Sequence, residues 1–269
     1  MKYLFLALLI TSGCATKNIN PDSESRFLSE NKIIKSTHLG YDVQYRVLIP
    51  KNYAALDDLP TIYITDGQDY ITSGKMPRVI NKLIEENRIR PTIGVFIDSR
   101  DTADLSKNRR NAQFACNYQY FEFVTHELVS KIDLDYRTSQ NANDRAILGL
   151  SFGGLNSACF GLLGSDVFNG IAMQSPATFP VPDLIKYYQQ SKKLPLKFYI
   201  SSGSVKDFRM QTRVFYKAIK NMGYPVKYQK VPGSHNWDNW RPLLDDVMIY
   251  FFPWENVGQV SERKDLFGH

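Results

Sequence analysis

One ten-residue stretch constrains the fold of this 269-residue chain more than any other: residues 145–154 read RAILGLSFGG. An apolar run of strand-forming residues leads into Gly-x-Ser-x-Gly, and a helical pattern follows. Only small residues such as Gly149 and Gly153 allow a strand and a helix to approach closely around a strained turn. We therefore predict a sharp strand–turn–helix unit that presents the Ser151 hydroxyl at the helix N-terminus as a nucleophile. An ordinary structural turn is the alternative.

Apolar segments of strand length alternate with helical patterns along the rest of the chain. The predicted strands cover residues 45–49, 61–65, 92–97, 146–150, 170–174, 197–201 and 226–231, and the predicted helices cover 77–87, 118–132, 154–163, 182–190, 209–222 and 241–251. Such alternation predicts an α/β fold with a mostly parallel sheet and helices on both faces. The first pair of strands, 33–38 and 41–49, is joined too tightly for a crossover and is predicted to be an antiparallel hairpin.

The N-terminal segment has the pattern of a bacterial export signal. Residues 1–13 contain one early charge, an apolar run and three small residues directly before Cys14. The run is far shorter than the roughly 18 residues of a membrane-spanning helix. We predict a lipoprotein-type signal at 1–13, a lipidated Cys14, a polar tether at 14–26 and one domain at 27–269. A plain cleaved signal is the alternative, because Thr11 stands where lipoprotein signals usually carry leucine. Either signal places the protein in the bacterial cell envelope. It is expected to be periplasmic or, if lipidated, anchored in the outer membrane.

A serine hydroxyl needs a general base, and one histidine has the expected position. His38 lies in the predicted hairpin, His126 lies within a predicted helix, and His269 is the last residue. His235 follows the last predicted strand, where the loops at the carboxyl ends of the strands converge. We therefore predict that His235 is the base.

The acid of such a triad follows the preceding strand, which gives the order Ser, Asp or Glu, His. Asp207 is the one carboxylate of the segment GSVKDF at 203–208. It is predicted to hold the imidazole in the correct tautomer, although an aspartate there could also cap the next helix. The oxyanion hole is predicted to use the backbone N–H of Phe152 and that of Gln68, in the loop after the strand 61–65.

Composition excludes several other classes of protein. Hydrophobic residues make up 43% and charged residues 22%, which excludes a disordered chain. The net charge of +6 is spread along the sequence, so no nucleic-acid partner is expected. No metal site or cofactor is expected either, because the histidines are far apart and no Cys-x-x-Cys occurs. Cys116 and Cys159 could form a disulfide or remain two buried thiols.

Together these segments resemble the putative-esterase family of α/β-hydrolases, which contains enterobactin esterases, mycolyltransferases and the human esterase D group. The similar segments are IPKNY at 49–53, YITDGQDY at 63–70, GLSFGG at 149–154 and GSHNWDNWR at 233–241. The resemblance implies the α/β-hydrolase fold and a serine esterase that acts through an acyl-enzyme. Within the last segment, Trp240 is expected to pack in the core, and Arg241 is expected to pair with a carboxylate beneath the loop.

A further segment, RNAQFACN at 110–117, is similar to the R-x-x-E-L-P-x-N run of siderophore esterases, although Gln113 stands where that run has glutamate and Ala115 where it has proline. The resemblance implies a catecholate siderophore of the enterobactin trilactone type as substrate, either iron-free or as the anionic ferric complex. Arg110 and Arg109, in the loop after the strand 92–97, and Trp237 are predicted to bind it. One alternative is a carbohydrate esterase that removes feruloyl or acetyl groups. Another, from a different class, is a catalytically inactive binding lipoprotein. The sequence does not fix the oligomeric state.

Overall fold

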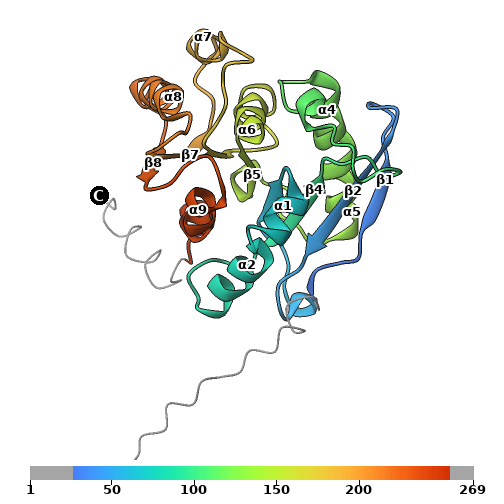
Figure 1. Cartoon of the computed structure of the whole chain (residues 1–269). Coiled ribbons are helices and arrows are strands. Elements are labelled where there is room, and N and C mark those ends of the chain that lie inside the picture. Colours follow the sequence, from blue (N-terminus) through green and yellow to red (C-terminus); the bar gives the residue numbers. More distant parts are fainter. Residues whose placement is uncertain (1–26, 255–269) are drawn as a thin grey trace, which may run out of the picture.

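A computed structural model describes residues 27–254, in which eight strands form one sheet in the order β1-β2-β4-β3-β5-β6-β7-β8 (Figure 1). The strands are β1 (Lys32–Lys35), β2 (Asp42–Leu48), β3 (Thr61–Ile64), β4 (Ile93–Asp98), β5 (Arg145–Leu150), β6 (Gly170–Gln174), β7 (Lys197–Gly203) and β8 (Val226–Val231). Strands β3 to β8 run parallel, and β2 pairs antiparallel with both β1 and β4. This confirms the predicted mostly parallel sheet and its antiparallel hairpin. The turn of that hairpin contains Gly40 at φ 74°, a left-handed conformation that glycine adopts without strain.

Helices cover both faces of the sheet. They are α1 (Gly67–Thr72), α2 (Met76–Glu85), α3 (Arg110–Gln113), α4 (Tyr118–Glu122), α5 (Val129–Asp135), α6 (Phe152–Leu163), α7 (Leu184–Gln190), α8 (Arg209–Asn221), α9 (Trp237–Trp240) and α10 (Leu244–Phe251). The predicted helix 118–132 is continuous but contains a π-helical turn at Phe123–Leu128 between α4 and α5. Helices α1, α3 and α9 were not predicted. Each spans six residues or fewer, too few to give a helical hydrophobic pattern.

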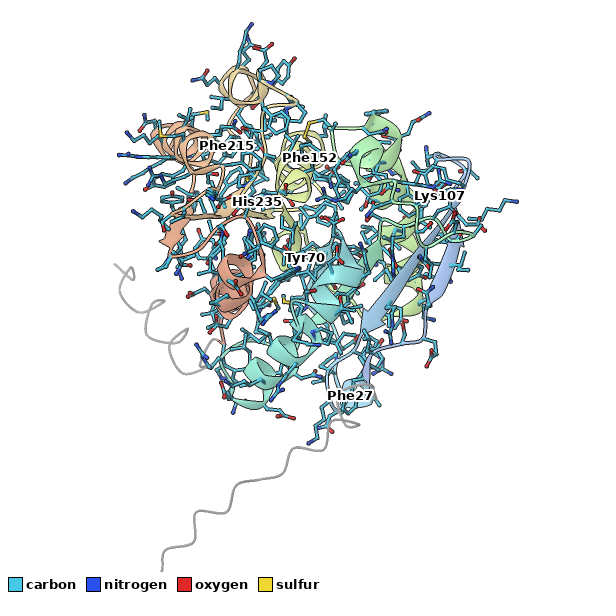
Figure 2. The ribbon with its side chains drawn as sticks, in the orientation of Figure 1. Phe27, Tyr70, Lys107, Phe152, Phe215 and His235 are labelled. Atoms are coloured by element: carbon cyan, nitrogen blue, oxygen red, sulfur yellow. A yellow bond between two sulfur atoms is a disulfide. The ribbon has the colours of Figure 1, made fainter. Side chains whose placement is uncertain are left out.

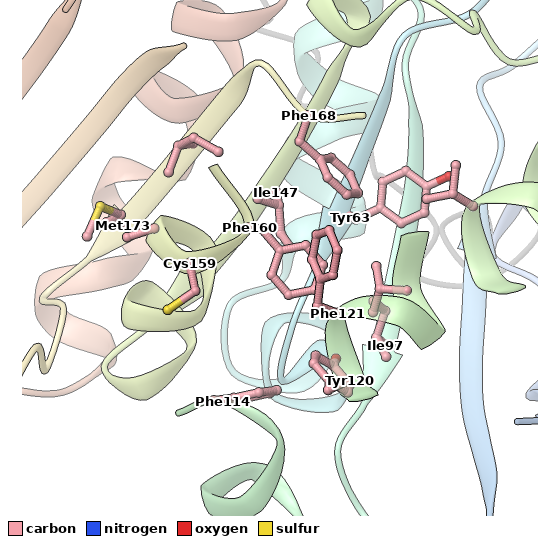
Figure 3. Packing of buried hydrophobic residues seen from close by; sticks show 14 of the residues in the cluster. Tyr63, Ile97, Phe114, Tyr120, Phe121, Ile147, Cys159, Phe160, Phe168 and Met173 are labelled. Carbon is pink, nitrogen blue, oxygen red and sulfur yellow. The ribbon is translucent and has the colours of Figure 1, made fainter. Parts of the chain in front are cut away.

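The core lies in two layers, one on each side of the sheet. Tyr63 packs into the layer beneath α4, α6 and α8, whereas its neighbours Ile62 and Ile64 pack into the layer beneath α2 and α10. This alternation follows from the period of two along a strand. In the first layer Phe168 contacts Tyr63 and Phe160 edge to face, with ring centroids 5.3 and 5.8 Å apart (Figure 3). A sheet buried on both faces explains why the strand segments are apolar throughout.

The parallel strands direct their carboxyl ends to the same edge of the sheet. The loops after β3, β5, β6, β7 and β8 therefore meet there, as ligand-binding loops do in α/β sheets. The predicted signal at 1–13, the tether at 14–26 and the lipidation site Cys14 lie outside the described residues. Within 27–254, no helix combines the length and the hydropathy needed to cross a membrane.

Candidate active site

The predicted strand–turn–helix unit is confirmed around Ser151. Strand β5 ends at Leu150, α6 begins at Phe152, and Ser151 between them has φ 55° and ψ −117°. A Cβ atom added to Gly149 would lie 2.2 Å from the carbonyl carbon and oxygen of Gly153. Glycine is thus required by the close approach of strand and helix. The turn holds Ser151 in a strained conformation at the start of a twelve-residue helix, as a nucleophile elbow does.

The loops after β7 and β8 bring Asp207 and His235 together. His235 Nδ1 lies 2.7 Å from Asp207 Oδ1, and the Asp207 side chain is fully buried. Burial alone would raise the pKa of Asp207, but the hydrogen bonds that its carboxylate accepts, from His235 and Ser175 first, hold the pKa below its usual value. Asp207 is therefore an ionised partner for one ring nitrogen of His235.

Hydrogen bonds to both oxygens fix the orientation of the Asp207 carboxylate. Oδ1 also accepts from the backbone N–H of Phe208 at 2.8 Å, and Oδ2 accepts from Ser175 Oγ at 2.7 Å, Asn239 Nδ2 at 3.1 Å and the backbone N–H of Gly203. Asn239 is fully buried and also donates to the carbonyl oxygen of Ser234, beside His235. Neither Ser175 nor Asn239 was predicted, because no local sequence pattern distinguishes them and they meet only around Asp207.

Trp240 confirms its predicted packing role. It is 6% exposed, its ring lies edge to face against the His235 ring at 4.9 Å, and its indole Nε1 donates to Ser175 Oγ at 2.9 Å. The expectation for Arg241 was wrong. Its Nε donates to the backbone carbonyl of Ser73, 2.7 Å away, so within the described residues 27–254 it ties the histidine segment to the end of α1 through a peptide group and not through a carboxylate.

Gln68 lies in the first turn of α1, directly after β3. The backbone N–H groups of a first helical turn have no partner within the helix, which leaves that of Gln68 available to a ligand. Asp66 precedes this turn at φ 52° and is 1% exposed. Its carboxylate accepts from Ser99 Oγ at 3.0 Å and from Arg110 Nε and Nη2 at 3.0 and 2.9 Å. The loop that carries Gln68 is therefore held by a two-pronged ion pair.

Each predicted substrate-binding residue already has protein partners. The Arg110 guanidinium is bound to Asp66 and lies 5.7 Å from the Phe152 ring. Arg109 pairs with Asp101 and lies 4.3 Å from the ring of Tyr41. Trp237 contacts the Tyr70 ring edge to face at 5.2 Å and the ring of Trp240 at 5.6 Å. These contacts give all three residues a structural role, and their contact with substrate stays a prediction.

A disulfide joins the segment after α3 to the helix behind Ser151. Cys116 and Cys159 are bonded, with their Cα atoms 5.4 Å apart, so the disulfide alternative is the one the structure contains. The bond connects the Arg110 segment to α6.

Nowhere in residues 27–254 do three or more His, Cys, Asp or Glu side chains group closely enough to hold a metal ion. In Figure 2, the labelled Phe152, His235 and Tyr70 come from α6, the segment before α9, and α1.

The architecture and the elbow are those of the α/β-hydrolase class. A family model described as "Putative esterase" matches residues 36–251, so the chain belongs to that family. It is 26% identical over 235 residues to YjcH, an uncharacterised protein of Bacillus subtilis, across 81% of this chain and 95% of that protein. It is also 26% identical over 122 residues to the iron(III) enterobactin esterase of Escherichia coli K12, across 45% of this chain and 29% of the esterase.

Two solved structures share the fold. The enterobactin esterase of Shigella flexneri, crystallised in the presence of enterobactin, superposes with a TM-score of 0.74 at 21% identity. The match covers 82% of this chain but only 57% of that one. A ferulic acid esterase superposes with a TM-score of 0.71 at 19% identity and covers 84% of this chain and 98% of its own. Family membership makes ester hydrolysis the activity to test.

Proposed function

We propose that this protein is a serine esterase with Ser151 as nucleophile, His235 as general base and Asp207 as the acid that orients the base. The observation that carries the proposal is the 2.7 Å contact between His235 Nδ1 and a buried, ionised Asp207, in loops at the same sheet edge as the strained Ser151. With Nδ1 fixed by Asp207, the free Nε2 is the atom that accepts the serine proton.

The proposed reaction has two halves. In the first, Ser151 Oγ attacks the ester carbonyl while His235 takes its proton, and the alcohol leaves with that proton as the acyl-enzyme forms. In the second, His235 activates a water that releases the acid and restores the serine. The backbone N–H groups of Phe152 and Gln68 would stabilise the oxyanion in both halves, because each lies in the first turn of a helix at the carboxyl edge of the sheet.

As substrate we propose a catecholate siderophore of the enterobactin trilactone type, in iron acquisition. The proposal is supported by the similarity to enterobactin esterases and by the segment at 110–117. A carbohydrate esterase that removes feruloyl or acetyl groups is the second candidate, favoured by the likeness to a ferulic acid esterase over 98% of that chain. Hydrolysis of the trilactone compared with feruloylated xylan fragments separates the two.

The test of the catalytic proposal is Ser151→Ala, assayed on a nitrophenyl ester with Ser165→Ala as a control. Ser165 follows α6 and precedes β6, so it lies at the opposite edge of the sheet. We expect Ser151→Ala to lose at least three orders of magnitude in kcat and Ser165→Ala to change it less than twofold. A fluorophosphonate probe should label the wild type and not Ser151→Ala. Absence of labelling in the wild type would favour an inactive binding lipoprotein.

We further propose that the protein is exported and anchored in the bacterial cell envelope through a lipidated Cys14. The support is the sequence pattern of residues 1–14 together with the Cys116–Cys159 disulfide, since disulfides persist in oxidising compartments. Cys14→Ser should move the protein from the membrane fraction to the soluble fraction with kcat unchanged. Wild-type protein without lipid in the soluble fraction would contradict the anchor.

A further inference from the structure

Three phenylalanines form a continuous series of ring contacts between the nucleophile segment and the base. Phe152, next to Ser151, lies 5.6 Å from Phe179 between ring centroids, and Phe179 lies 5.9 Å from Phe208. Phe208, next to Asp207, contacts the imidazole of His235 edge to face at 4.8 Å. We call these three residues the phenylalanine wall. It begins beside the proposed nucleophile and ends on the proposed base, so a substrate seated between those two groups must pass close to it.

The wall remains partly open to solvent. Phe179 is 53% exposed, and Phe152 and Phe208 are each only partly buried. A single exposed aromatic ring is common on protein surfaces. Three contacting rings from three different segments, the start of α6 after β5 and the loops after β6 and β7, form instead a contiguous apolar surface, a feature that can mark a binding site. Phe152 packs against the core layer that contains Tyr63, whereas Phe179 and Phe208 belong to neither core layer.

The contacts of each ring suggest which part of the wall can receive a ligand. Phe152 has the Arg110 guanidinium 5.7 Å away, and Phe208 has the His235 imidazole on one side. Phe179 touches the other two wall rings and is the most exposed of the three. Aromatic rings bind one another edge to face or in offset stacks at centroid separations of about 4.5–7 Å. The exposed part of Phe179 thus offers a planar apolar partner to a further ring.

We propose that the phenylalanine wall binds an aromatic ring in the acyl half of the ester and that Phe179 is its specificity-determining residue. This inference rests on the proposed esterase function, whose two substrate candidates with a ring both have one in the acyl half; the feruloyl ester carries it there alone, and the trilactone carries a ring on both sides of each ester. The wall discriminates by apolar contact with the ring. An ester with a short aliphatic acyl group occupies the same catalytic residues but leaves the wall uncovered.

The test compares methyl cinnamate, methyl butanoate and benzyl acetate as substrates of the wild type, Phe179→Ala and Trp254→Ala. Trp254 is a matched control because it is an exposed aromatic, at 42%, and follows Pro253, which pairs with Ile89 before β4 at the opposite sheet edge. We expect Phe179→Ala to lower kcat/KM for methyl cinnamate about five- to tenfold, mainly through KM, and for methyl butanoate less than twofold. Trp254→Ala should change neither value.

Equal losses on cinnamate and butanoate, or no loss on either, would overturn the role of Phe179. A loss confined to benzyl acetate would overturn the assignment to the acyl half. A second measurement does not depend on catalysis: titration of methyl cinnamate into Ser151→Ala and into Ser151→Ala/Phe179→Ala, with weaker binding expected for the double variant. If the wild type hydrolyses none of the three esters, the esterase proposal fails, and this titration alone decides whether the wall binds the ring.

Discussion

The candidate site has two sides, and each is built around one buried carboxylate. On the base side, in the loops after β7 and β8, Asp207 accepts hydrogen bonds from His235, from neutral side chains and from backbone N–H groups. On the oxyanion side, in the loops after β3 and β4, Asp66 accepts from Ser99 and from both prongs of the Arg110 guanidinium. Both carboxylates accept hydrogen bonds on both oxygens, but only Asp66 has a permanent positive charge against it.

This difference explains why the acid of the catalytic proposal is Asp207. The donors around Asp207 hold it ionised without cancelling its charge, so that charge can stabilise the imidazolium that forms when His235 takes a proton. The charge of Asp66 is already balanced by Arg110, and the pair serves to fix the loop that carries Gln68. A substitution on the base side should therefore lower the rate of the chemical step directly. A substitution on the oxyanion side should lower that rate indirectly, by shifting the loop that carries Gln68.

The largest expected effect is that of His235→Ala. Because nucleophile and base act as one unit, we expect kcat to fall by at least three orders of magnitude, as for Ser151→Ala, with the double variant no worse than either single one. The measurement is kcat on a neutral nitrophenyl ester. His126→Ala is the control, since His126 lies on the π-helical turn and is mostly exposed. Additive losses in the double variant would mean that His235 is not the base for Ser151.

Asp207→Asn compared with Asp66→Asn tests the contrast between the two carboxylates. Asp207→Asn should lower kcat about 10³- to 10⁴-fold, because an amide favours the wrong imidazole tautomer and cannot stabilise the imidazolium. Asp66→Asn should cost far less in kcat but should destabilise the fold, because it breaks a mostly buried ion pair. Thermal unfolding and kcat of both variants give the comparison. A larger loss of kcat in Asp66→Asn would reverse the assignment of the acid.

A smaller effect is expected from Asn239→Ala. Within residues 27–254, Asn239 donates no hydrogen bond to His235 and acts through Asp207 Oδ2, so it is a positioning residue. We expect a 30- to 100-fold loss of kcat with KM unchanged within about twofold. The acid limb in the pH profile of kcat should shift to higher pH, because Asp207 loses a donor to its charged form and its pKa rises. Asn236→Ala is the matched control, since that side chain is exposed and bonds to Ser234 Oγ and the Asp238 N–H. Unchanged kcat and pH profile in Asn239→Ala would leave it a packing residue only.

The residues set by local backbone geometry could be predicted from the sequence. The Gly149–Gly153 spacing predicts the elbow because only a strand–helix turn requires both glycines, and the structure confirms this at Ser151. The contact between Asp207 and His235 follows from parallel strands, whose carboxyl ends meet at one edge. Chain order alone was therefore enough to pair two residues that lie far apart in sequence.

Residues fixed by contacts between loops could not be predicted. Ser175 and Asn239 come from different segments and meet only around Asp207, so no local pattern marks either one. The prediction of a carboxylate partner for Arg241 was wrong for the same reason, because its actual partner, Ser73 at the end of α1, is distant in the sequence. Arg110 lies in a segment that the family resemblance singled out for substrate binding, which stays a prediction, and a sequence cannot show that its guanidinium is bound to a buried aspartate.

The smallest expected effect is that of Arg110→Ala, which separates positioning from substrate binding. The Arg110 side chain is 24% exposed and its charge is balanced by Asp66, so the pair contributes little attraction for an anionic ferric catecholate. Its removal leaves Asp66 buried without a cation, which should cost about 1–3 kcal/mol of stability and loosen the turn that carries Gln68. We expect kcat to fall about three- to tenfold on the ferric siderophore and on a neutral nitrophenyl ester alike, with KM changed less than twofold on both.

Arg110→Lys should restore part of the stability and less of kcat, because an ammonium cannot form the two-pronged pair. If KM rises about tenfold for the ferric complex alone, and salt weakens wild-type binding of that complex selectively, Arg110 contacts the substrate and the balance of charge on this side is incomplete.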